Sequence, residues 1–82
     1  MTINEKIVRN IFLILEKMDK DDNFKERFSN ISSLEYFYQK LQPFISTKRI
    51  VNILNGKSKR ITLEELIHIA NALNVHLYEL VK

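Results

Sequence analysis

The apolar residues of this chain are spaced as in helices from one end to the other, and this constrains the fold more than any other feature. Apolar side chains recur three or four positions apart, and no useful stretch alternates like a half-buried strand. The 82 residues include one glycine and one proline, which leaves little sequence for loops. We therefore expect an all-α fold, a compact bundle of five helices, or of six if residues 21–28 are also helical.

The length and composition suit one domain covering residues 1–82. No cysteine is present, which excludes disulfides and thiolate metal sites and fits a reducing compartment. No apolar run approaches the roughly 18–20 residues of a membrane span, and the start of the chain lacks the features of a secretion signal. These features predict a cytoplasmic protein without a membrane partner or a cofactor.

The first expected helix, from about Ile3 to Met18, carries apolar side chains over about half of its circumference. That is wider than one packing partner usually needs. Leu13 lies apart from them on a charged face, either as an isolated exposed residue or as a contact to a partner. The two apolar stripes are Ile3, Ile7, Ile11, Ile14 and Met18 and, beside them, Val8, Phe12 and Leu15.

Three further helices have clear start signals. Ser32, Ser46 and Thr62 are expected N-caps, because their side-chain oxygens can accept from the free N–H groups of a first turn. Asn74 can end the third of these helices, and a short helix over about 77–81 closes the chain. The residues expected to face the core are Leu34, Phe37, Tyr38 and Leu41, then Ile50, Ile53 and Leu54, then Leu63, Leu66, Ile67, Ala70 and Leu73.

The polar segment 19–30 imitates the start of a calcium-binding loop through Asp19 and Asp21. The sixth position of such a loop would be Phe24 where glycine is needed, and the twelfth would be Asn30 where glutamate is needed. We therefore expect no calcium site and no other metal site.

Positive charge is concentrated in residues 46–60. This segment contains five basic residues and no acid, whereas the remaining eight basic and ten acidic residues give a net charge of −2. On charge alone, a polyanion-binding surface and an ordinary solvated basic surface explain the pattern equally well. The five basic residues are Lys48, Arg49, Lys57, Lys59 and Arg60.

The outward face of the expected helix 47–54 carries short or forked hydrogen-bonding side chains together with Val51. Asparagine pairs with adenine, lysine and arginine suit guanine, and threonine offers a hydroxyl and a methyl group. These properties favour insertion of the helix into the major groove of DNA. The residues expected to read bases are Thr47, Lys48 and Asn52, with Arg49 toward one edge.

The residues that flank this helix suit contact with phosphate. Ser46 leaves the helix N-terminus free to approach an anion, and the loop after the helix offers three cations and a hydroxyl. The alternative is a short surface helix followed by a cationic turn. The residues expected to contact phosphate are Ser46, Lys57, Ser58, Lys59 and Arg60.

Residues 46–81 resemble the C-terminal half of the Cro/C1-type (XRE-family) helix-turn-helix domain of phage and bacterial repressors. The resemblance is carried by "RIVNILNGKSKRITLEEL" and "IANALNVHLYELV". It implies a lambda-repressor-like fold, double-stranded DNA as partner and a bacterial or phage-infected cell. By position it implies base reading by Thr47, Lys48 and Asn52, and it adds Ser33 as a phosphate contact. The connection 42–45 is about two residues longer than the turn of that family.

The resemblance also implies a candidate homodimer, since dimer surfaces in the family often use the last helix. The alternative is that most of these side chains pack inside the domain. The candidate dimer contacts are Leu13, Leu77, Tyr78, Leu80 and Val81.

The expected function is therefore sequence-specific DNA binding by a transcriptional regulator, with repression as the favoured direction. The alternative is a protein-interaction module, such as an adaptor, antitoxin or inhibitor, because a fold does not determine a function. An enzyme is not expected. His68 and His76 have no nucleophile at a suggestive spacing, and the chain has no glycine-rich phosphate loop.

Overall fold

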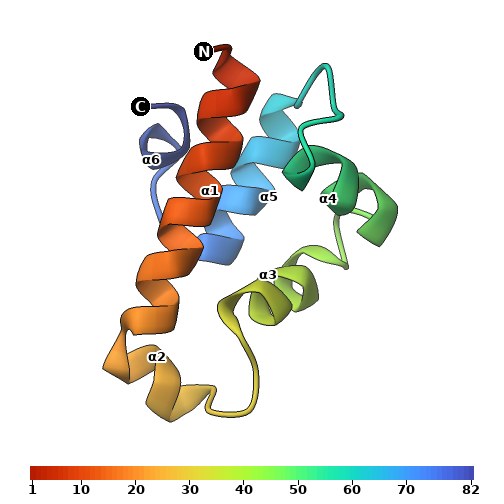
Figure 1. Ribbon diagram of the computed structural model, residues 1–82. Coiled ribbons are helices and arrows are strands. Elements are labelled where there is room, and N and C mark those ends of the chain that lie inside the picture. Colours follow the sequence, from red (N-terminus) through yellow and green to blue (C-terminus); the bar gives the residue numbers. More distant parts are fainter.

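The computed structural model describes all of residues 1–82, as six α-helices without a strand (Figure 1). The expected all-α bundle is confirmed, in its six-helix form. The helices are α1 (Ile3–Lys20), α2 (Asp22–Arg27), α3 (Ser33–Leu41), α4 (Thr47–Leu54), α5 (Leu63–Leu73) and α6 (Tyr78–Val81). None of them is both long and apolar enough to cross a lipid bilayer.

The helices begin and end at the residues whose side chains or backbone suit those positions. Thr2 and Thr62 form complete capping boxes with Glu5 and Glu65, in which side chain and backbone satisfy each other. Asn74 ends α5 in the left-handed conformation, with φ at 56°. The side chains that cap the remaining helices are those of Asp21 for α2, Ser32 for α3 and Ser46 for α4; α6 has no side-chain cap.

One hydrophobic core joins five of the six helices. α1 packs against α3 and α6, α5 packs against the same two helices, and α4 packs against α3. Asn10 is a polar residue buried beside this core, where its Nδ2 donates to the carbonyl oxygen of Leu80 at 2.9 Å and so ties α6 to α1. The core residues are Ile7, Ile11, Leu15, Phe37, Leu41, Ile45, Ile50, Ile69, Ala70, Ala72, Leu73 and Leu80.

Some residues expected in the core lie at its edge. Leu63 and Ile67 are 63% and 45% exposed, because α5 turns its other side, with Ile69 and Leu73, toward α3. Ile67 follows Leu66 by about 100° around the helix, which carries it past the buried face. Leu34 is also exposed, at the solvent side of α3. Ile3 and Phe12, at the outer edges of the wide apolar arc of α1, are exposed as well.

Candidate nucleic-acid interface

The N-terminus of α4 is defined by Ser46. Its Oγ accepts a hydrogen bond from the backbone N–H of Arg49 at 3.2 Å, as expected of an N-cap. Ile50 and Ile53, three residues apart, are 1% and 2% exposed and anchor one side of the helix in the protein. Because these two residues determine the rotation of α4 about its axis, the opposite face is turned to solvent.

Three of the four residues expected to read bases lie on this open face. Thr47 and Lys48 are exposed and Asn52 is half-buried, with Val51 exposed between them. Gln42 lies next to this group, since its Nε2 donates to Thr47 Oγ1 at 3.2 Å. Gln42 was not expected at this surface from the sequence, where its only signal is a polar side chain between α3 and α4.

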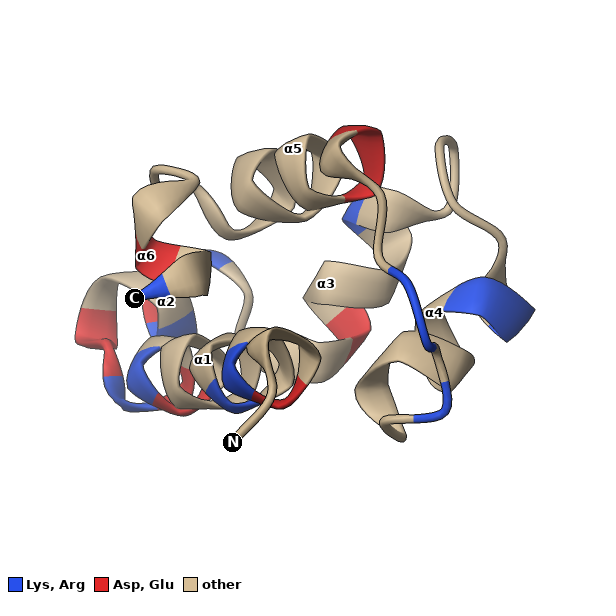
Figure 2. Cartoon of the chain, turned by 90° about the horizontal axis from the view of Figure 1, so that it is seen from above, with Lys and Arg blue, Asp and Glu red and all other residues tan.

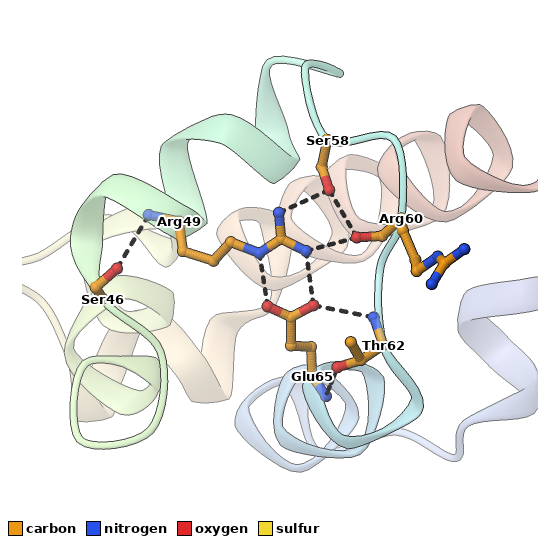
Figure 3. A network of polar contacts seen from close by, with 6 residues as sticks. All are labelled: Ser46, Arg49, Ser58, Arg60, Thr62 and Glu65. Atoms are coloured by element: carbon orange, nitrogen blue, oxygen red, sulfur yellow. Dashed lines mark hydrogen bonds and ion pairs between the residues drawn. The ribbon is translucent and has the colours of Figure 1, made fainter.

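Arg49 is the exception, and the structure corrects its assignment to base reading. Nε and Nη2 of its guanidinium donate to the two carboxylate oxygens of Glu65, at 2.6 and 2.8 Å (Figure 3). Nη1 donates to Ser58 Oγ at 2.8 Å, and Nη2 donates also to the carbonyl oxygen of Arg60 at 2.6 Å. Four of the five N–H donors of a guanidinium are thus engaged inside the protein. Arg49 therefore joins α4 to α5 and to the loop between them.

This network is electrostatically coupled. The hydrogen bonds from Arg49 lower the pKa of Glu65 to about 2, and a further hydrogen bond from the backbone N–H of Thr62, at 2.9 Å, acts in the same direction. The pKa of Arg49 is raised in turn, mainly by its hydrogen bonds to Glu65. Both groups therefore stay charged at neutral pH and largely cancel each other. Arg49 consequently adds little to the positive potential outside the protein.

The loop after α4 begins at Gly56, whose φ of 72° suits glycine at the end of a helix. The backbone N–H of Lys57 then donates to the carbonyl oxygen of Asn52 at 2.9 Å, which closes the helix end. Lys57, Lys59 and Arg60 are exposed, and neither they nor Lys48 form an ion pair. Figure 2 shows these basic segments of α4 and the loop at one end of the molecule, whereas basic and acidic positions are mixed along α1.

Two serines expected to contact phosphate are placed differently. Ser33 is 1% exposed, and its backbone N–H donates to Asp19 Oδ1 at 2.9 Å. Its side chain is fully buried and its backbone N–H already has a partner, so the expectation of a phosphate contact is wrong. Ser58 is half-buried, since its Oγ accepts from Arg49 and donates to the carbonyl oxygen of Arg60 at 2.9 Å. Its hydroxyl belongs to the network that shapes the loop.

The candidate dimer contacts differ in how far they are buried. Leu13 and Tyr78 are 49% and 67% exposed and are free to meet another molecule. Leu77 and Val81 are half-buried and pack against the core. Leu80 is fully buried, so the expectation that it forms a dimer contact is wrong. Burial of Leu80 follows from the packing of the short α6 against both α1 and α5.

Two polar side chains and one lysine of α4 therefore lie at the same end of the molecule as three cations of the following loop. We call this surface the basic face. Its residues are Thr47, Lys48, Asn52, Lys57, Lys59 and Arg60. Comparison of the chain with protein-family models, with curated proteins and with solved structures found no match.

Proposed function

We propose that the chain binds double-stranded DNA sequence-specifically through the basic face. It acts as a transcriptional regulator that represses transcription. The observation that carries this proposal is the arrangement on α4. Thr47 and Asn52 can hydrogen-bond to base edges, and they share an end of the molecule with four cations that lack an acidic partner. A polyanion is attracted to such a surface.

In the proposed complex α4 enters the major groove, which is wide enough for an α-helix. Lys48 suits guanine, Asn52 suits adenine, and Val51 offers apolar contact to a thymine methyl group. Lys57, Lys59 and Arg60 contact the phosphate backbone and fix the register of the helix in the groove without reading sequence.

The resemblance of residues 46–81 to the Cro/C1-type family supports the same proposal and suggests its setting, the cytoplasm of a bacterial or phage-infected cell. Repressors of that family bind DNA as dimers on two-fold-related half-sites, about one helical turn apart. Leu13 and Tyr78 are the exposed members of the candidate dimer contacts.

Selection from a random duplex library, followed by sequencing of the bound fraction, tests the proposal. We expect enrichment of a short motif, and a palindromic motif would also establish a symmetric dimer. A selection in which no motif is enriched over the starting library at low salt would contradict sequence-specific binding.

One observation favours a second function, that of a protein-interaction module. Leu63 and Ile67 lie one turn apart on α5 and are both exposed, and Phe12 and Leu13 are exposed on α1. Apolar surface of this kind is common on single proteins and also marks contacts to protein partners. A module of this type would bind its partner with little dependence on salt, unlike a DNA complex.

A further inference from the structure

Three consecutive carbonyl groups of the loop after α4 are held toward the body of the protein. The carbonyl oxygens of Ser58 and Lys59 both accept from Asn4 Nδ2 of α1, at 3.3 and 2.9 Å. The carbonyl oxygen of Arg60 accepts from Arg49 Nη2 of α4 at 2.6 Å (Figure 3). The donors belong to two different helices, so the loop backbone is fastened from two sides.

The orientation of these carbonyls determines the orientation of the backbone N–H groups that follow them. No peptide bond in the chain is cis, and in a trans peptide the N–H points opposite to the C=O. The N–H groups of Lys59 and Arg60 therefore point away from Asn4, and the N–H group of Ile61 points away from Arg49. None of the three donates a hydrogen bond within the chain.

Outward N–H groups favour an anion, whereas outward carbonyl oxygens would repel one. Backbone N–H groups contact DNA phosphate in many complexes, and successive N–H groups such as those of Lys59 and Arg60, which both point away from Asn4, can form an anion-binding surface. In this loop they lie beside the side chains of Lys59 and Arg60. Side-chain charge and backbone polarity therefore act on the same phosphate only while the carbonyls stay turned inward.

We infer that Asn4 and Arg49 are positioning residues of the proposed DNA interface, which hold the loop carbonyls inward so that the N–H groups of Lys59, Arg60 and Ile61 stay free to bind DNA phosphate. The inference rests on the proposed function. Neither Asn4 nor Arg49 touches DNA in this arrangement. Asn4 is the cleaner of the two to test, because Arg49 also forms the ion pair with Glu65.

The test compares full-length wild type with Asn4→Leu, which keeps a similar size and removes both hydrogen bonds. Asn71→Leu is the matched control, because Asn71 is an exposed asparagine in α5 whose side chain forms no hydrogen bond. Affinity for the selected duplex is measured over a range of salt concentrations. In parallel, ¹⁵N–¹H spectra record the backbone amides of Lys59, Arg60 and Ile61 with and without duplex.

Asn4→Leu is expected to weaken binding about 3- to 10-fold, the size of effect that one or two net hydrogen bonds produce. Its salt dependence should match that of wild type, because no charge is removed. The three amides should shift on addition of duplex in wild type and in Asn71→Leu, and much less in Asn4→Leu.

The outcomes separate this inference from the proposed function. If wild type binds duplex and Asn4→Leu binds equally well, the positioning role is overturned and the proposed function stands. The positioning role is also overturned if wild type binds duplex without a shift of the three amides. If wild type binds no duplex at low salt, the proposed function is overturned, and the inference with it.

Discussion

The middle of α1 and the loop after α4 are held in place by different forces. Ile7, Ile11 and Leu15 are at most 4% exposed and fasten α1 through burial of apolar surface. The loop has only one partly buried apolar residue, Ile61, and is fastened by hydrogen bonds and by the Arg49 ion pair. Apolar burial supports the fold as a whole, whereas directional polar contacts give the loop one shape. Changes in the core should therefore act mainly on stability, and changes on the basic face mainly on DNA binding.

Substitution in the core should give the largest effect, on stability alone. Ile11→Ala removes a fully buried side chain from the middle of α1 and should lower the free energy of unfolding by about 2–5 kcal/mol in urea denaturation. Leu13→Ala, on the same helix but 49% exposed, should cost less than about 1 kcal/mol. The affinity of the folded fraction of Ile11→Ala for DNA should be unchanged. Equal losses of stability would contradict this account of the core.

Substitution on the basic face should weaken DNA binding and leave stability almost unchanged. Asn52→Ala should weaken binding to the selected duplex by about 1–3 kcal/mol and relax the preference at one base pair, because a bidentate contact is lost. Thermal unfolding should change little. Asn55→Ala provides the control, since Asn55 is exposed just beyond the end of α4. If both variants bind alike, Asn52 does not read bases.

The two regions also differ in how far the sequence predicts them. Regular spacing of apolar residues and local capping signals act within a few positions, so they indicated the helices and most of the core. Ser46 and Thr62 were identified as caps for this reason. The same periodicity does not settle which edge of a wide apolar face is buried. Leu63 and Ile67 were therefore assigned wrongly to the core.

The polar contacts that shape the loop could not be read from the sequence. Arg49 and Glu65 are 16 positions apart, and Asn4 is more than 50 positions from the carbonyls that it binds. No local rule connects such residues, because only the packing of α1, α4 and α5 brings them together. An arginine on the edge of a helix looks the same in sequence whether it faces DNA or an internal carboxylate.

Lowering the pH should weaken the ion pair between Arg49 and Glu65, with a smaller effect than the two substitutions above. The pKa of Glu65 is lowered from 4.5 to about 2 in the folded protein. Its contribution to stability is therefore complete above about pH 4.5 and is lost as the pH falls toward 2. We expect Glu65→Gln to cost about 1–2 kcal/mol at neutral pH, a value reduced for the partial exposure of Arg49. The cost should shrink toward zero near pH 2 in denaturation experiments. A cost that is constant from pH 7 to pH 2 would contradict the assignment of this ion pair.

The smallest effect is expected for a single loop cation. Lys59→Ala should weaken binding to all duplex sequences about equally and reduce the log–log salt slope by about one unit, because one phosphate contact is lost. Stability should stay within about 0.5 kcal/mol of wild type, since Lys59 is exposed. Lys17→Ala, at an exposed position of α1 away from the basic face, should leave the slope unchanged. A similar change of slope in both variants would mean that general charge, and not the basic face, drives binding.

The most direct test of DNA binding by the basic face is the salt dependence of wild-type affinity for its selected duplex. Lys48, Lys57, Lys59 and Arg60 have no acidic partner, while the charge of Arg49 is compensated by Glu65. Four neutralised phosphates predict that log affinity falls with log salt concentration with a slope of about −4 per protomer. An affinity that does not change with salt, or the absence of a complex even at low salt, would contradict the account.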